Sequence, residues 1–511
     1  MPDNLAPSAG ERLESWAAWL DSRRRIIDAA LALVYVLLLL LPLSIFNLWY
    51  DELHTFYIAQ APSLAKFVEE VGRLDLNPPL LYALVRASHA LFGVTTVATR
   101  VPSIIAFFLA SLGILAFLSR RIGRMWAAAC VALLWNGPLF RYATEARPYA
   151  LLLAFFSLTL LSWDSAGSGG ARSRKSLAGI AIGNSGMMLS HVLAPLSIMP
   201  FCIAELVRTI RQRRIDWAMW AALLLPLAWA AAYLPFIHRI DGSIYPPVYQ
   251  ASLKTLLLFY GTALTGMFPG LPIALALAFP LALWRRTDSS VQRAVPVREW
   301  PLLIASLSAP VLLNLFMMRT GGPFWDRYAI TTSLVIYVSV MIFIAKECKF
   351  NSLAGFAAAF VLIAIHLGRD ARVVVMLSHR PASLKFTEVK PDLPVAANSA
   401  LTFLQMDHDE DAAFVRRLYY LTDPPASLKY AKTNIFDQLP TLKEYFPIRA
   451  NFESYSDFVA QHRHFLVFGL MDQSEYWLLQ KLRAEGADLQ RLGDFDTPYQ
   501  DGRLYEVTLA P

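Results

Sequence analysis

The fold is decided by the stretch RRRIIDAALALVYVLLLLLPLSIFNLWYDE, residues 23–52. Three arginines are followed by a predominantly apolar run from Ile26 to Leu48, and about 20 such residues are enough for a helix to cross the hydrocarbon core of a bilayer. The run is too long for the core of a signal peptide and lacks a small-residue cleavage site, so we expect it to stay in the protein as an anchor. Trp49-Tyr50-Asp51-Glu52 follows it directly.

The composition extends this conclusion to most of the chain. Of the 511 residues, 56% are hydrophobic and only 17% are charged, whereas soluble domains are about 45–50% apolar and about 25% charged. Enough apolar residues are present for many spans of roughly 20 residues each. The composition therefore excludes a soluble enzyme, a disordered chain and a receptor with a single anchor.

Ten more apolar runs have lengths that indicate further spans. They lie near residues 99–118, 125–142, 148–163, 177–190, 192–208, 217–236, 269–284, 300–317, 328–345 and 352–368. Lys and Arg gather in alternate loops between these runs, as the positive-inside rule requires, if residues 1–25 are cytoplasmic and the run Leu80–Phe92 does not cross. That run is short and carries Arg86 and His89, so we expect an interfacial helix on the outer side.

The sequence thus predicts a polytopic α-helical membrane protein with about eleven transmembrane helices in residues 26–368 and a first outer loop at 49–98. Such a protein belongs in the inner, cytoplasmic membrane, with residues 369–511 delivered to the outer, periplasmic side. Residues 388–511 contain 19 acidic and 12 basic residues. The basic excess of the chain therefore lies in the membrane part, where it indicates topology and contact with membrane lipids rather than nucleic-acid binding.

The C-terminal segment has the pattern of a soluble α/β domain. A strand-like run, His464–Leu470, precedes an amphipathic helical stretch, Glu475–Glu485, that stops at Gly486. Leu504–Leu509 looks like another strand. A disordered tail would not carry these signals, so we expect a folded outer domain.

Ionisable residues gather at the outer ends of the expected spans. Asp51 and Glu52 follow the first span, and adjacent carboxylates framed by aromatic residues at a membrane surface need an explanation. Further polar clusters fall at the same level: Asn77-Pro78-Pro79, the segment Arg141–Tyr149, His191, and Asp326-Arg327-Tyr328. Each alone is typical of a surface pair, a turn or an interfacial anchor. Together they predict a site for a phosphate-bearing lipid and a hydroxyl acceptor.

These residue types suit the transfer of a sugar from a lipid phosphate to a hydroxyl. A carboxylate can take the proton of the acceptor, and arginines can pair with the phosphate as its negative charge grows. The sequence has no nucleotide-binding Gly-rich loop and no His/Cys metal cluster. We therefore expect no nucleotide donor, and no cofactor is required, although a divalent metal ion stays compatible with the sequence.

The order of Asp51-Glu52, Asn77-Pro78-Pro79-Leu80, Arg141–Tyr149, His191 and Asp326-Arg327-Tyr328 resembles the bacterial membrane glycosyltransferases of the protein O-mannosyltransferase-like superfamily. These are similar in turn to the lipid A aminoarabinose transferases and belong to the C superfold. The resemblance covers roughly residues 26–345. It departs from the pattern at Asn77, where the relatives usually have His before Pro-Pro.

The resemblance implies a polyprenyl-phosphate-linked sugar donor, a glycan, lipid or protein acceptor on the outer face, and inversion at the anomeric carbon. It makes Asp51 the expected general base, with Glu52 as the second catalytic carboxylate. Arg147 and Arg327 become the expected ligands of the lipid phosphate. The other residues expected around the substrates are Arg141, His191, Tyr149, Tyr328 and Asn77.

Two other functions are compatible with the same residues. A lipid or solute transporter also places charged residues among its helices, although its polar breaks should lie near the bilayer midplane. An inert membrane scaffold that presents the outer domain to partners is the third possibility. The clustering of polar residues at one face favours the enzyme.

Overall fold

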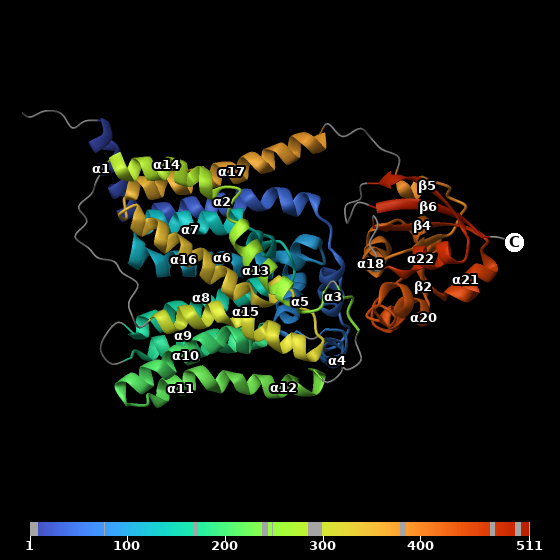
Figure 1. Cartoon of the computed structure of the whole chain (residues 1–511), viewed down its shortest axis with the longest axis horizontal. Helices are drawn as coiled ribbons and strands as arrows, with labels where there is room; N and C mark the ends of the chain where they lie inside the picture. The colour runs from blue at the N-terminus through green and yellow to red at the C-terminus, as the bar shows by residue number, and fades with distance from the viewer. Residues whose placement is uncertain are drawn as a thin grey trace, which may run out of the picture.

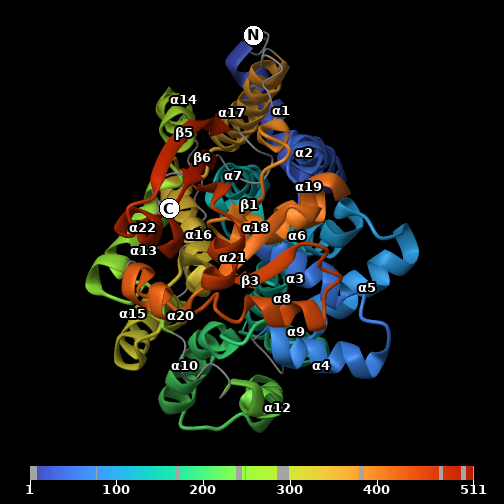
Figure 2. The same cartoon turned by 90° about the vertical axis from the view of Figure 1, so that its right-hand side faces the viewer.

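The computed structural model describes residues 9–75, 77–167, 172–237, 244–247, 249–284, 299–378, 385–470, 476–495 and 502–509. A bundle of helices, many of them side by side, forms the larger part, and an α/β domain sits beyond one end of it (Figures 1 and 2). The bundle and its loops contain α1 (Ala9–Ser22), α2 (Arg24–Ile45), α3 (Tyr50–Ile58), α4 (Leu64–Leu74), α5 (Leu80–Phe92), α6 (Thr96–Ile122), α7 (Arg124–Asn136), η1 (Pro138–Ala143), α8 (Tyr149–Gly167), α9 (Arg174–Ser190), α10 (Ala194–Gln212), α11 (Trp217–Leu224), η2 (Leu225–Leu227), α12 (Ala228–Ile237), α13 (Leu253–Thr265), α14 (Leu271–Trp284), α15 (Trp300–Thr320), η5 (Asp326–Ala329), α16 (Ile330–Glu347) and α17 (Ser352–Ser378).

Six helices of the described residues are long and apolar enough to cross a membrane. Their apolar segments are Arg24–Ile45, Thr96–Ile122, Tyr149–Ala166, Trp300–Thr320, Asp326–Glu347 and Ser352–Met376. The predicted class, a polytopic helical membrane protein, is therefore confirmed. The helix α17 continues past residue 368, where the membrane part was expected to end, to Ser378.

The other expected spans correspond to helices that are shorter, interrupted or, in the case of α10, less apolar. The run 125–142 is divided because α7 ends at Asn136 and Gly137-Pro138 starts the short helix η1, and proline favours the first turn of a new helix over the interior of an old one. Pro226 likewise separates α11 from α12. The helix α5 has the expected bounds, Leu80–Phe92, whereas α13 was not expected from the sequence.

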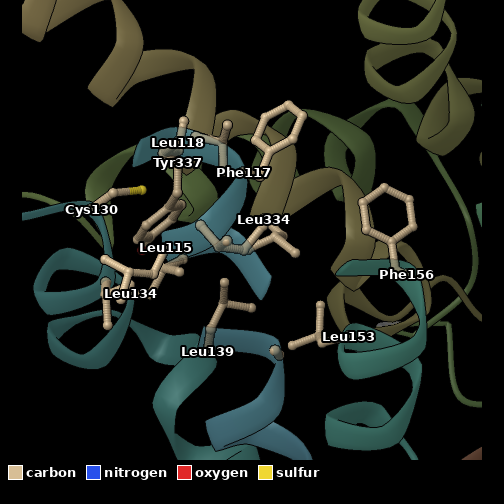
Figure 3. Close-up of a cluster of buried hydrophobic side chains, with 14 of the residues drawn as sticks. Leu115, Phe117, Leu118, Cys130, Leu134, Leu139, Leu153, Phe156, Leu334 and Tyr337 are labelled. Carbon is tan, nitrogen blue, oxygen red and sulfur yellow. The ribbon is translucent and has the colours of Figure 1, made fainter. Parts of the chain in front are cut away.

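The core of the bundle lies between α6, α7, α8 and α16. Figure 3 shows Leu115, Leu134, Leu153 and Leu334 from these four helices in one buried cluster. The helices α6 and α8 approach closely at Gly113, where an added Cβ would lie 2.8 Å from the Cβ of Ser157. This packing fixes the outer ends of the helices, which carry the polar clusters.

The C-terminal segment folds into a six-stranded sheet with helices. Its elements are β1 (Val395–Ala397), α18 (Ala400–Asp409), α19 (Ala412–Arg416), β2 (Leu418–Thr422), α20 (Pro424–Ala426), β3 (Asn451–Ser454), α21 (Tyr455–Gln461), β4 (His464–Leu470), α22 (Trp477–Ala484), β5 (Asp488–Phe495) and β6 (Gly502–Thr508), with the short helical turns η6 (Phe386–Glu388), η7 (Ser427–Ala431) and η8 (Leu439–Glu444). The strand order is β3-β2-β1-β4-β6-β5. The first four strands are parallel, and β6 runs antiparallel to β4 and β5.

The α/β class predicted for this segment is also confirmed. The strand β4 has the bounds expected from the sequence, and β6 contains most of the expected run Leu504–Leu509. The helix expected at Glu475–Glu485 is α22, although residues 471–475 lie outside the described residues. Gly486 follows it with φ +78°, a left-handed conformation that glycine adopts without strain.

The α/β domain packs on the helices of the first outer loop. Leu53 and Ile58 of α3 and Phe67 of α4 belong to the same buried cluster as Phe403 and Phe446 of the domain. Polar contacts join the same parts: Gln405 Nε2 donates to the Leu48 carbonyl at 3.3 Å, and Arg73 Nη1 donates to the Tyr445 hydroxyl at 2.9 Å. The first outer loop and the domain therefore share one core.

Phe446 tests this shared core, because its ring lies 4.8 Å from that of Tyr57 and 5.3 Å from that of His54. Phe446→Ala should remove about 3–5 kcal/mol of packing and increase amide hydrogen exchange in α3. Phe458 is a matched control, because it is fully buried in the same domain but in a separate cluster. If Phe458→Ala exposes α3 as much as Phe446→Ala does, the contact does not hold α3 in place.

Candidate active site at the outer end of the bundle

The helix α3 carries the two adjacent carboxylates, and the structure separates them. Glu52 is fully buried and lies against Arg100, which is only 2% exposed. Arg100 Nε donates to Glu52 Oε1 at 2.8 Å and Arg100 Nη2 donates to Oε2 at 2.7 Å. The remaining donors of Arg100 reach the carbonyls of Phe46 and Asn47, both at 2.8 Å.

Glu52 also holds the backbone of the Arg147 loop. Its Oε1 accepts the backbone N–H of Ala146 at 2.7 Å, and the Thr55 hydroxyl donates to the Ala146 carbonyl at 3.0 Å. A third hydrogen bond joins Oε2 to the N–H of Trp49 at 3.3 Å. Both oxygens of Glu52, the second catalytic carboxylate expected from the sequence, are thus engaged in hydrogen bonds to the protein.

Asp51 points into a different environment. Its side chain is 21% exposed, and its Oδ2 lies 3.3 Å from Arg147 Nη2 and 3.7 Å from Arg327 Nη1. Among the described residues, no hydrogen bond to its other oxygen, Oδ1, is found. Asp51 therefore has one oxygen close to two arginines and a second one without a hydrogen bond.

Arg147 bridges Asp51 to another carboxylate. Its Nη1 lies 3.4 Å from Asp75 Oδ2. Asn77 orients Asp75, because its backbone N–H and its amide Nδ2 both donate to Asp75 Oδ1, at 3.1 and 2.9 Å. Burial acts to raise the pKa of Asp75, but Arg147, Tyr82 and the Asn77 backbone hydrogen bond outweigh it and hold that pKa below its usual value. Asn77 thus lies behind Asp75 and holds it in place.

His54 lies one helical turn after Asp51 on α3, with its ring 4.9 Å from that of Tyr50. Its Nε2 is buried and has no hydrogen-bond partner among the described residues. Burial lowers the pKa of His54, although Asp75 and Asp51 partly oppose this effect. The ring is therefore neutral near pH 7 and can donate or accept one hydrogen bond in the site.

Arg327 and Arg141 complete the cationic side of the site. Arg327 lies in η5, with its guanidinium 5.1 Å from the ring of Trp325. Arg141 lies in η1, donates to the Tyr142 hydroxyl at 2.6 Å and is half exposed, 4.0 Å from both Glu145 and Asp326. Below these two arginines a groove runs between η1, α13 and α16.

The groove is mostly apolar. Its walls include Leu139, Phe259, Ala263, Ile330 and Tyr337, and its polar rim is formed by Arg141, Asp326 and Arg327. Its free volume is about 30 Å³, which is room for a small apolar group, while the rim offers cationic donors to an anion.

Three aromatic residues expected at the site pack on one another. The ring of Tyr149 lies 5.4 Å from that of His191, which in turn lies 6.3 Å from that of Tyr328. His191 is buried, and its Nδ1 accepts the N–H of Leu193 at 3.0 Å. Burial lowers the pKa of His191 to about 3. His191 is therefore a neutral turn residue that packs on Tyr149, and the charges of Arg147, Asp75 and Arg327 also act on it.

The structure thus brings together Asp51, Arg147, Arg327 and Arg141 from three separate segments. Asp75, His54 and Arg100 were not expected from the sequence. Arg100 carried a signal, because an arginine within the expected span 99–118 needs a partner. Asp75 lies two residues before Asn77-Pro78-Pro79 in the same polar cluster. Among the described residues, no group of three or more His, Cys, Asp or Glu could hold a metal ion.

The two adjacent carboxylates should differ in their effect on stability. Glu52→Gln leaves the charge of Arg100 buried without a counter-charge, and breaking such a pair costs about 3–5 kcal/mol. Asp51→Asn changes a partly exposed group and should cost about 1 kcal/mol or less. Thermal unfolding of the two purified variants in the same detergent measures the difference. Equal losses in both would contradict the separation of roles.

No protein-family model matches the chain, and no curated protein matches it. Solved structures of similar fold include two crystal structures of ArnT from Cupriavidus metallidurans. The structure bound to undecaprenyl phosphate aligns over 95% of this chain and 98% of its own, with a TM-score of 0.49 and 13% identity. The apo structure aligns over 96% and 98%, with a TM-score of 0.47 and 12% identity. A likeness at this level says nothing of activity, which depends on the residues of the site.

Proposed function

We propose that this protein is a membrane glycosyltransferase that moves a sugar from a polyprenyl-phosphate donor to a hydroxyl acceptor at the outer face. The observation that carries the proposal is the position of Asp51 beside Arg327, which lines the apolar groove together with Arg141. Arg141 and Arg327 offer planar donors for a phosphate. The groove below them has a free volume of about 30 Å³, so it offers apolar contact to a small part of a polyprenyl chain next to the phosphate.

The reaction proceeds by a single displacement. The acceptor oxygen attacks the anomeric carbon from the side opposite the phosphate, so the configuration inverts. The proton of the acceptor hydroxyl passes to Asp51, and the bond between the anomeric carbon and the phosphate oxygen breaks with its electron pair going to the phosphate. Asp51 acts as general base, and Oδ1 is the oxygen available for the proton.

The three arginines have two different functions in this reaction. Arg147 faces two carboxylates, Asp51 and Asp75, so its charge is already balanced and its task is to orient Asp51. Arg327 and Arg141 stabilise the negative charge that grows on the departing phosphate, because cationic donors fixed in advance lower the energy of such a transition state. Arg327 is in a position to do both, because it lies 3.7 Å from Asp51 and also lines the groove.

Asp51→Asn tests the proposal because it keeps the shape of the side chain and removes its ability to take a proton. We expect cells that lack this protein to lose an envelope glycan and the wild-type protein to restore it. Asp51→Asn should lower the transfer rate about 10²- to 10⁴-fold. Binding of a synthetic polyprenyl phosphate to the purified variant should be largely kept.

Arg327→Lys should show the opposite pattern in the same assays. A lysine keeps the charge but cannot reproduce the fork of two donors. The loss of a charge-assisted hydrogen bond is about 1.5–3 kcal/mol, which is roughly 10- to 150-fold in affinity for polyprenyl phosphate. If a folded Asp51→Asn protein transfers sugar at the normal rate, the assignment fails and a transporter becomes the better interpretation.

Glu145 should make donor binding depend on pH. Burial raises the pKa of Glu145 to about 7, although Arg141 acts to lower it. Below this pH the group is neutral; above it the carboxylate forms, balances Arg141 and repels the phosphate. Donor affinity should therefore fall as pH rises through about 7, by roughly 5-fold if the repulsion is about 1 kcal/mol.

The measurement uses a polyprenyl phosphodiester sugar, whose own charge is constant over this range. Glu145→Gln is the control, because it should bind the donor tightly at both pH 6 and pH 8. A Glu145→Gln protein with an unchanged pH profile would mean that another group is responsible.

A further inference from the structure

The α/β domain contains a second polar crevice that the transfer reaction does not use. It lies at the carboxyl ends of β1 and β2, beside the start of α22. In this sheet β2 and then β3 are added on one side of β1, and β4 is added on the other side of β1, so the strand order reverses there. Open parallel sheets bind their ligands at such a point, outside the carboxyl ends of the strands.

The side chain of Asn398, the residue directly after β1, indicates that the crevice binds a ligand. It is 8% exposed, and its Oδ1 has no hydrogen-bond partner among the described residues. Its backbone is fixed, since its N–H donates to the Phe468 carbonyl at 2.8 Å. Gly469 packs against the side chain, where an added Cβ would lie 2.5 Å from the Cβ of Asn398. A buried polar atom held in place without a partner costs stability unless a ligand hydrogen-bonds to it.

The lining of the crevice indicates the chemistry of that ligand. Aromatic rings come from Tyr420, Phe436, Tyr476 and Trp477, and no charged residue is among its lining residues. The free volume is about 20 Å³, which is room for one small polar group. A hydroxyl or hydroxymethyl group fits the interior, while the ring that bears it can lie on the aromatic rim formed by Phe436 and Trp477, the two of these residues that are partly exposed. A neutral sugar has this combination of groups.

A nucleotide, which many parallel sheets bind at this position, does not fit. The residues after β1 are Asn398 and Ser399, with no Gly-rich loop to admit a phosphate. The Ser399 hydroxyl is already used, because it accepts the N–H of Leu401 at 3.2 Å and caps α18. An uncharged lining also offers nothing to balance a phosphate.

The crevice adjoins the helix that carries Asp51. Phe436, which lines it, has its ring 6.2 Å from that of Tyr50, the residue before Asp51. Thr433, also in the lining, donates from its hydroxyl to the Ile244 carbonyl of the bundle at 2.8 Å. A glycan seated in the crevice would therefore lie beside α3.

We infer that this crevice binds a neutral glycan and that the acceptor of the transfer reaction is such a glycan, held by Asn398 and the aromatic rim while another of its hydroxyls approaches Asp51. The inference that the glycan is the acceptor rests on the proposed function. The binding of the glycan does not, because it can be measured without donor or turnover.

The test presents the full-length protein in detergent to an array of immobilised neutral and acidic oligosaccharides. The wild-type protein should bind a set of neutral glycans. Asn398→Ala and Trp477→Ala should each weaken this binding at least tenfold. Asn398→Ala should leave the melting temperature nearly unchanged, because it removes an unpaired group rather than a structural hydrogen bond.

Two controls keep the test specific. Phe495→Ala removes a half-buried aromatic ring from β5, away from the crevice, and should bind glycans normally. Binding is measured without donor, so a failure of the transfer reaction is separated from a failure of the crevice. Absence of neutral-glycan binding by the wild-type protein, a preference for acidic glycans, or equal binding by all variants would overturn the inference.

Discussion

The ion pair between Glu52 and Arg100 is the interaction on which the site depends. Two charges without access to water are stable only where their geometry and hydrogen bonds are nearly complete, and here every oxygen of Glu52 is occupied. The pair joins α3 to α6 and fixes Ala146, so that Arg147 is held beside Asp51. The buried carboxylate of Glu52, with both oxygens hydrogen-bonded, thus helps to position Asp51, whose Oδ1 makes no hydrogen bond among the described residues.

The sequence was informative about the fold class, because this follows from composition and from the lengths of the apolar runs. The polar clusters that it placed at the outer face do converge around Asp51. It could not assign different environments to Asp51 and Glu52, since adjacent residues on a helix face different directions and only the packing decides which one meets Arg100. Asp75 was missed for a similar reason: its importance arises from Arg147, a residue distant along the chain.

The same limit applies to the α/β domain. A strand such as β4 can be predicted from its long apolar run. The strand β1 has only three residues and no pattern that distinguishes it from a loop. Asn398 follows this short strand, and nothing in the local sequence marks it as unpaired. The environment of the Asn398 side chain depends on Gly469 and Phe468, and these two residues come close to it only when β4 pairs with β1. Long-range pairing therefore creates the crevice.

The shared core of the first outer loop and the C-terminal domain has a consequence for biosynthesis. Gln405 contacts the Leu48 carbonyl across 357 positions of the chain, and Phe446 covers His54 from still farther along. At a synthesis rate of about 5–20 residues per second, roughly 20 to 70 s pass between the emergence of α3 and of the segment that covers it. During that interval the carboxylate-bearing helix lacks half of its packing. A part of the protein that is made several hundred residues after α3 thus completes the packing of the helix that carries Asp51.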